Sequence, residues 1–104
     1  MSYRKHQTPL EHRRVLQLAR EYRRQGFDVT VYPASEDLPT ELAQCPLDLV
    51  AKGEDKVIAV EVRTRDNLTL NGSEDLRRME GKIRTLPGWQ FELVVTNPRP
   101  RKAS

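Results

Sequence analysis

The chain has 104 residues, enough for one domain but not for two independent cores. Hydrophobic residues make up 37% and charged residues 32%, so we expect one modest core beneath an ionic surface. We expect no membrane span and no secretory signal, because no long apolar run occurs and the first residues are polar. Cys45 is the only cysteine, which excludes an internal disulfide and a thiolate metal site and favours a cytoplasmic protein.

Charge is unevenly distributed along the chain, although the net charge is only +3. Residues 1–26 contain seven Lys or Arg and two acids (+5), residues 27–61 two and eight (−6), and residues 62–104 nine and five (+4). A basic beginning and end around an acidic middle is typical of a phosphate-binding surface beside a carboxylate site. An ordinary solvated surface gives the same pattern, so charge alone does not decide between the two.

A helix is expected over residues 9–25, because Thr8 can cap it, Pro9 suits its first turn and Gly26 can end it. Apolar side chains at helical spacing give this helix one buried stripe. The stripe consists of Val15, Leu18, Ala19 and Tyr22. The arginines at positions 13, 14, 20, 23 and 24 lie mostly off it.

The remaining pattern predicts strands separated by turn-rich segments and one further helix. The expected elements are strands over residues 27–32, 47–52, 56–64 and 91–95, a loop over 33–46 with a short helical turn near 41–44, and a helix that begins at residue 73 and stops at Pro87. This order predicts an α/β domain over residues 1–97, with a small mixed sheet flanked by helices. Residues 98–104 form a basic tail that we expect to be disordered or a linker.

Glu61 is the most informative residue, because it interrupts a strand that is otherwise apolar on both faces. Burying a carboxylate there is costly unless it is paired, bound to a metal or at an open strand end. If the preceding turn is centred between Glu54 and Asp55, Asp48 lies directly opposite Glu61, with Cβ atoms roughly 5 Å apart. Two such carboxylates repel unless a cation lies between them, and oxygen ligands suit Mg²⁺ or Mn²⁺. Arg63 is on the same face and is a candidate phosphate contact.

Glu11 falls on the buried stripe of the first helix, at helical spacing from Val15, Leu18 and Tyr22. It is therefore a third candidate acid for the site. A glutamate in the first turn is also a routine stabiliser of a helix N-terminus, and the sequence leaves both roles open.

The segment Pro46-Leu47-Asp48, followed after twelve residues by Glu61-Val62-Arg63, resembles the signature of the PD-(D/E)xK nucleases. The nearer similarity is to the archaeal Holliday-junction-resolvase-like group of restriction-endonuclease-like proteins. It extends over nearly the whole chain and includes the early helix with its glutamate, the pair Gly26-Phe27 and the segment 87–98.

This resemblance implies a restriction-endonuclease-like core and a divalent-metal-dependent phosphodiesterase that acts on DNA, with structure-selective recognition. It implies that Asp48 and Glu61 hold Mg²⁺ or Mn²⁺ and that Glu11 is the helix-borne acid of resolvase-like members. It also places Arg63 in the catalytic set, at a position where the family usually has lysine. Arginine keeps the charge but does not readily release a proton, so this difference bears on cleavage.

Two lysines are alternative candidates for the missing one. Lys52 shares a side of its strand with Asp48, and Lys82 is on the second helix. If the chain binds DNA, the basic residues that we expect to contact its phosphates are Arg13, Arg20, Arg24 and Arg65.

The competing hypothesis is a nuclease-fold module that binds nucleic acid or assembles with a partner protein without cleaving, which Arg63 favours. A further alternative is a protein-binding subunit whose acidic segment 36–41 contacts a basic partner. One chain of this size covers little DNA, so we expect a homodimer or a fused partner domain.

Overall fold

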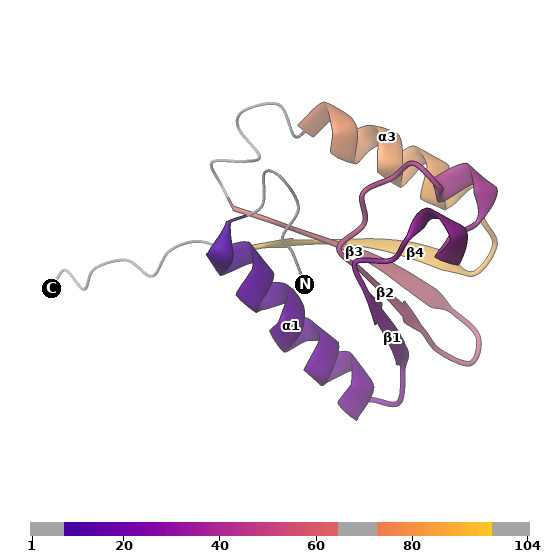
Figure 1. Cartoon of the computed structure of the whole chain (residues 1–104). Coiled ribbons are helices and arrows are strands. Elements are labelled where there is room, and N and C mark those ends of the chain that lie inside the picture. Colours follow the sequence, from indigo (N-terminus) through magenta and orange to yellow (C-terminus); the bar gives the residue numbers. More distant parts are fainter. Residues whose placement is uncertain (1–7, 65–72, 97–104) are drawn as a thin grey trace, which may run out of the picture.

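The computed structural model describes residues 8–64 and 73–96, and within its second long helix the side chains from Leu76 onward (Figure 1). The elements in chain order are α1 (Pro9–Arg24), β1 (Asp28–Val31), the 3₁₀ helices η1 (Ser35–Asp37) and η2 (Thr40–Leu42), β2 (Leu49–Lys52), β3 (Val57–Arg63), α3 (Ser73–Arg84) and β4 (Trp89–Val95). Arg65 and the tail expected over residues 98–104 lie outside the described residues.

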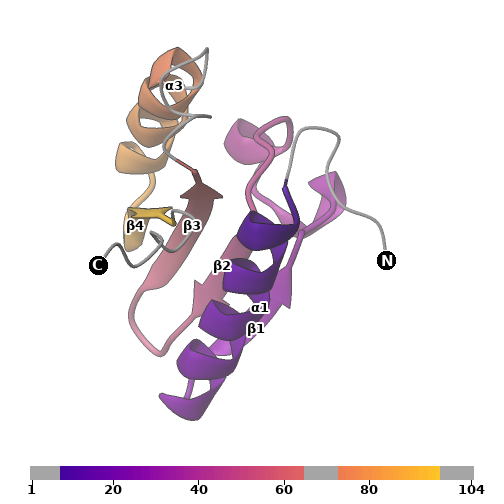
Figure 2. The ribbon, with the colours of Figure 1, turned by 90° about the vertical axis from the view of Figure 1, so that its left-hand side faces the viewer.

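The four strands form one mixed sheet in the order β1-β2-β3-β4. β1 and β3 are both antiparallel to β2, whereas β4 runs parallel to β3, with α3 between them in the chain. Two views at right angles place α1 on one face of the sheet and α3 on the other (Figures 1 and 2). This arrangement confirms the predicted α/β fold with a mixed sheet flanked by helices.

The α1 helix begins as its sequence predicts. The Thr8 side chain accepts a hydrogen bond from the Glu11 N–H, and the Glu11 carboxylate accepts one from the Thr8 N–H, which together form a capping box. The helix ends at Arg24, one residue before the predicted end. Gln25 is its C-cap, and Gly26 follows with φ +98°, in the left-handed region that glycine adopts without steric cost.

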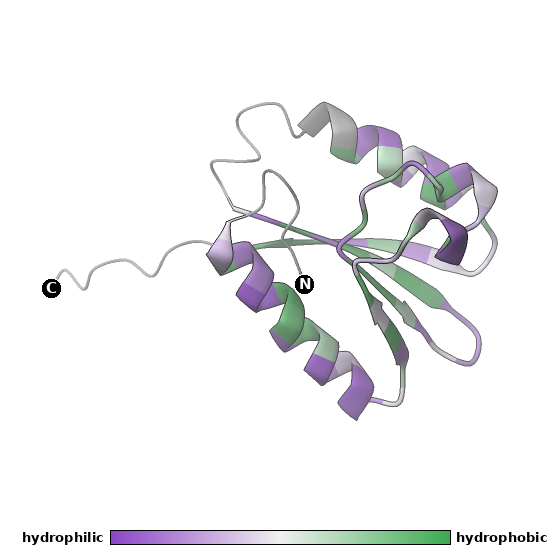
Figure 3. Cartoon of the chain, viewed as in Figure 1, coloured by the Kyte–Doolittle hydropathy of each residue, from purple (hydrophilic) through white to green (hydrophobic). Residues whose placement is uncertain are grey.

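The sheet separates two apolar clusters, one beneath each helix, and apolar residues lie along the inner side of α1 (Figure 3). The cluster beneath α1 contains Val15, Leu18, Ala19, Val29, Leu49, Ala51, Ile58, Val60 and Val62. The cluster beneath α3 contains Leu42, Cys45, Leu47, Val50, Ala59, Leu76, Met79 and Ile83. Along β3, even-numbered residues therefore face α1 and odd-numbered residues face α3, as expected of a strand buried on both faces.

The register of β2 and β3 agrees with the predicted turn. Leu49 pairs with Val60 and Lys52 with Val57, so the numbers of paired residues sum to 109. β3 lies between β2 and β4 and is thus an interior strand, as predicted.

Several predicted boundaries were wrong, among them the first residue of β2 (Leu49, not 47) and both ends of β3 (Val57–Arg63, not 56–64). β1 is shorter than 27–32, because pairing with β2 covers only Asp28–Val31. The helical turn expected near 41–44 lies instead at Thr40–Leu42, after a second short turn at Ser35–Asp37. β4 begins at Trp89 rather than residue 91, because its first residue already pairs with Val57. Among the described residues, no helix has the length and apolar character needed to span a membrane.

Candidate functional site

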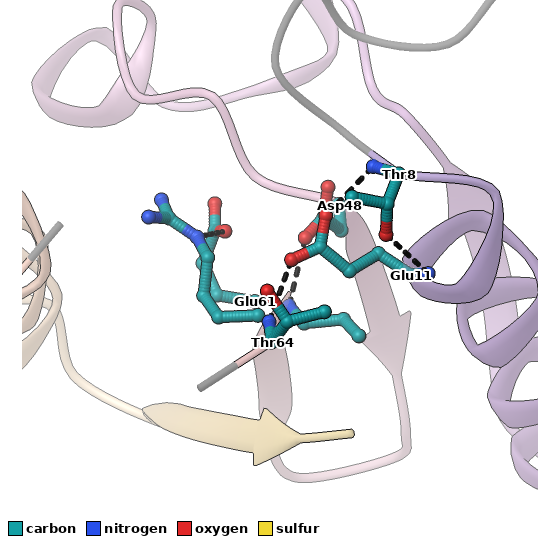
Figure 4. A network of polar contacts seen from close by, with 7 residues as sticks. Thr8, Glu11, Asp48, Glu61 and Thr64 are labelled. Carbon is teal, nitrogen blue, oxygen red and sulfur yellow. Dashed lines mark hydrogen bonds and ion pairs between the residues drawn. The ribbon is translucent and has the colours of Figure 1, made fainter. Parts of the chain in front are cut away.

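Three buried carboxylates meet the end of β3, and each comes from a different element (Figure 4). Glu11 belongs to the first turn of α1, Asp48 precedes β2, and Glu61 belongs to β3 itself. Their relative exposures are 1%, 2% and 0%, respectively. Ionised carboxylates are rarely buried to this extent unless they are paired, so the contacts of each one define what this region can do.

Asp48 directly precedes β2 and contacts β3 through both its backbone and its side chain. Its N–H donates to the Val60 carbonyl over 3.1 Å, and its Oδ2 accepts a hydrogen bond of 2.8 Å from the Val62 N–H. The paired register ends at Leu49 and Val60, and the Asp48 N–H donates to this same Val60, so the position of Asp48 opposite Glu61 stays a prediction. The side chain of Asp48 thus satisfies a backbone donor that β2 no longer reaches.

Glu11 joins the beginning of α1 to the end of β3. Its Oε1 accepts the Thr8 N–H over 2.9 Å, and its Oε2 accepts the Thr64 N–H over 2.6 Å, from a residue 53 positions later in the chain. Both roles that the sequence left open are thus compatible with its position. Glu11 stabilises the helix N-terminus, and its carboxylate also lies at the strand end beside Asp48 (Figure 4).

Val62 and Thr64 project their N–H groups from the same edge of β3, because backbone groups two residues apart point the same way along a strand. On this edge the hydrogen-bonding partner changes from the backbone of β2 to the carboxylates of Asp48 and then Glu11. The two acids therefore replace the part of the ladder that a longer β2 would form.

Glu61 is paired with the residue that was expected to contact phosphate. The Nε of Arg63 lies 3.1 Å from Oε1 of Glu61, and the side-chain exposures are 17% and 1%. The two residues are two positions apart on β3, so both side chains extend from the α3 face of the sheet. In this arrangement the guanidinium of Arg63 partly neutralises the buried Glu61 carboxylate, and the arginine side chain itself stays partly exposed to solvent.

The two alternative lysines differ in their relation to the site. Lys52 is exposed and pairs with Val57 at the far end of β2, roughly 13 Å of strand away from Asp48. Lys82 is exposed on α3 and is close enough to the Cys45 thiol to lower its pKa, while the Glu61 carboxylate raises the same pKa. Lys82 is thus the better placed of the two lysines, because both it and Glu61 act on the pKa of the Cys45 thiol.

The predicted phosphate contacts on α1 lie on the solvent side of the helix. Arg13, Arg20 and Arg24 are exposed and, at intervals of seven and four residues, follow one outward stripe. Polar residues mark this outer side of α1 (Figure 3).

One contact near the acids was not anticipated. Nδ1 of His12 lies 2.7 Å from the hydroxyl of Tyr32, and the two rings are nearly parallel, with centroids 5.6 Å apart. Nothing in the spacing of residues 12 and 32 indicates this contact. It depends on the tertiary approach of α1 to the end of β1.

Within residues 8–64 and 73–96, no group of three His, Cys, Asp or Glu side chains is arranged to hold a metal ion. The chemistry of the donors still fits a hard divalent cation, because Asp48, directly before β2, and Glu61, on the adjacent β3, both offer carboxylate oxygens. A cation held by these two acids would approach the carboxylate that now contacts Arg63.

Residues 3–104 match a family model described as restriction-endonuclease-like, of the archaeal Holliday-junction-resolvase-like (AHJR-like) type. No curated protein matches the sequence.

Proposed function

This chain belongs to the AHJR-like family of restriction-endonuclease-like proteins, and from that premise we propose that it hydrolyses DNA phosphodiester bonds with the help of a divalent metal. The observation that supports this proposal most strongly is the burial of two carboxylates, Asp48 directly before β2 and Glu61 on the adjacent strand β3. Burial of two carboxylates is costly, and binding of a divalent cation would offset part of that cost.

In this proposal Asp48 and Glu61 hold Mg²⁺ or Mn²⁺. When bound, the metal supplies a polarised water and neutralises charge that develops on the phosphate. Glu11 holds the end of β3 through the Thr64 N–H and thereby fixes the strand on which Glu61 lies. Asp48 does the same through the Val62 N–H, so the acids also maintain the local backbone geometry.

Arg63 contributes positive charge but no proton transfer. Its pKa lies far above neutrality, so the guanidinium cannot act as a base toward water. It can donate to a phosphate oxygen from the solvent-exposed part of its side chain, while Nε stays on Glu61. We therefore assign Arg63 to phosphate binding within the catalytic set.

The outward arginine stripe of α1 supplies the affinity for the DNA backbone. Arg13, Arg20 and Arg24 are exposed, and Arg65, outside the described residues, extends the basic character beyond β3. Contacts of this kind bind phosphates irrespective of sequence and weaken steeply with salt, which suits recognition of DNA structure. A second copy of the chain or a partner domain would enlarge the small DNA-binding surface of one chain.

The test is cleavage of branched, single-stranded and duplex DNA in Mg²⁺ or Mn²⁺ by the wild type, Asp48→Asn, Glu61→Gln and Arg63→Lys. We expect metal-dependent nicking by the wild type, a loss of at least about 100-fold in Asp48→Asn and Glu61→Gln, and retained or increased nicking in Arg63→Lys. If the wild type and Arg63→Lys are both inactive on every substrate, the nuclease proposal is wrong.

A second candidate function is binding of nucleic acid without cleavage, and the contact between Arg63 and Glu61 favours it specifically. A guanidinium already compensates the carboxylate, so the fold has one way to keep this acid buried without a metal. Salt-sensitive DNA binding with no turnover in either metal would distinguish this function from the nuclease.

A further inference from the structure

Tyr32 adopts a backbone conformation that side-chain-bearing residues rarely take. Its φ is +52°, and among the described non-glycine residues it alone has a positive φ. The left-handed region brings Cβ close to the backbone and is normally left to glycine or asparagine, so holding tyrosine there costs free energy. Such strain persists when the surrounding contacts require it, and it often marks functional sites.

The unusual backbone changes the face of the sheet that Tyr32 reaches. In β1, Val29 and Val31 contribute to the cluster beneath α1, whereas Thr30 is exposed. Regular alternation would put Tyr32 on the side of Thr30. Instead its ring packs against the α1 cluster, and its hydroxyl contacts Nδ1 of His12 at 2.7 Å. The positive φ is thus what brings the tyrosine to the histidine.

The pair lies between the segments that supply two of the acids. His12 follows Glu11 directly in the first turn of α1. The Tyr32 N–H donates to the Asp48 carbonyl over 2.8 Å, one step beyond the last pair of β1 and β2. One side-chain contact therefore connects the helical turn that holds Glu11 to the backbone that holds Asp48.

We propose that His12 and Tyr32 are positioning residues that fix the first turn of α1 against the start of β2, and so set Glu11 relative to Asp48. Their importance for catalysis rests on the proposed nuclease function. Their effect on the carboxylates does not, because it can be observed at the Thr64 and Val62 N–H groups, which donate to Glu11 and Asp48.

The primary experiment compares amide hydrogen exchange by NMR in the wild type, Tyr32→Phe and His12→Phe. Tyr32→Phe keeps the ring and removes only the hydroxyl, and His12→Phe keeps a planar ring and removes Nδ1. The matched control is Tyr22→Phe, because Tyr22 also packs its ring against the α1 cluster, in edge contact with Phe27.

We expect the Thr64 amide to exchange about 3- to 10-fold faster in Tyr32→Phe and His12→Phe. This factor corresponds to the net free energy that one hydrogen bond contributes. Amides in the middle of β2 and β3 should keep their wild-type rates, and Tyr22→Phe should leave Thr64 unchanged. Unchanged exchange at Thr64 in both variants would overturn the proposal. Faster exchange throughout the sheet would overturn it equally, since that pattern reports general destabilisation.

Cleavage kinetics then separate this inference from the proposed function. In an active wild type, we expect Tyr32→Phe to lower kcat several-fold with little change in KM, because the pair sets the acids and does not bind DNA. A loss confined to KM would contradict the positioning role. A wild type without metal-dependent cleavage would refute the nuclease function, while the exchange at Thr64 would still decide the role of the pair.

Discussion

On β3, the guanidinium of Arg63 lies against the carboxylate of Glu61, with Nε 3.1 Å from Oε1. The carboxylate is almost completely buried, and the arginine is largely so. Desolvation of the acid is therefore offset by a cation from its own strand. We therefore expect the stability of the fold to depend on Arg63.

Arg63→Met tests that dependence directly. The substitution leaves the Glu61 carboxylate buried without its guanidinium partner, which we expect to destabilise the protein by about 3 kcal/mol in metal-free buffer. Urea unfolding followed by circular dichroism measures the change. Arg84→Met is the matched control, because Arg84 makes an ion pair of the same 3.1 Å length with Glu80, but at an exposed position. Removing that pair should cost no more than about 0.5 kcal/mol. Equal effects of the two substitutions would show that burial of Glu61 does not require Arg63.

The same variant tests competition between the arginine and a metal. If Mg²⁺ binds at Glu61 and Asp48, it should raise the unfolding temperature of Arg63→Met more than that of the wild type, since no guanidinium occupies the carboxylate. Thermal unfolding with and without about 10 mM Mg²⁺ gives the comparison. The double variant Arg63→Met with Glu61→Gln should lose the extra shift. Identical shifts in all three proteins would argue against a metal at Glu61.

Asp48 has a structural role that is separable from metal binding. Asp48→Ala leaves the buried Val62 N–H without the acceptor that Oδ2 provides, which we expect to cost about 1–3 kcal/mol. Asp48→Asn retains an oxygen acceptor of the same reach, so its loss of stability should be smaller. Chemical unfolding of both variants checks this order. If Asn is as destabilising as Ala, the negative charge rather than the hydrogen bond is what the fold requires.

The sequence predicted the part of the site that depends on local periodicity. The hairpin register follows from the position of the turn, and the burial of Glu61 follows from the apolar residues on both sides of it. Glu11 was placed on the buried stripe because helical spacing relates it to Val15. These inferences need only the periods of a helix and a strand.

The contacts that the sequence did not predict depend on tertiary structure. The acceptor role of Asp48 toward Val62 arises because β2 ends where β3 continues, and strand ends are the least predictable bounds. The contact of His12 with Tyr32 requires a positive φ at a tyrosine, which local propensity argues against. In both cases the packing of distant segments overrides the local preference.

Glu11 should contribute more to stability than its capping role alone. Thr8→Ala removes one half of the capping box and should cost about 1 kcal/mol. Glu11→Ala removes the other half and also leaves the buried Thr64 N–H without its acceptor, so we expect a loss at least about 1 kcal/mol larger. Urea unfolding of the two single variants makes the comparison. A Glu11→Ala variant no less stable than Thr8→Ala would show that the bond to Thr64 adds nothing to stability.

Cys45 makes the stability of the fold sensitive to alkaline pH. Burial raises the pKa of its thiol above the ordinary value, the Glu61 carboxylate raises it further, and Lys82 partly opposes the shift. The folded state therefore holds the proton more tightly than the unfolded state. The resulting stabilisation is fully present below the unfolded pKa near 9.0 and is lost as the pH rises through the folded value.

We expect unfolding free energies of the wild type to fall between about pH 8 and pH 10 more steeply than those of Cys45→Ala, which has no thiol to ionise. Tyr22, whose pKa is also raised by burial and by Glu92 and Glu21, should give both proteins a common loss at higher pH. Alkylation of the folded wild type by iodoacetamide near pH 8.5 should be much slower than that of free cysteine, because both the thiolate fraction and its access are reduced. Parallel pH profiles of the two proteins, or alkylation as fast as that of the free amino acid, would show that the thiol is neither buried nor shifted.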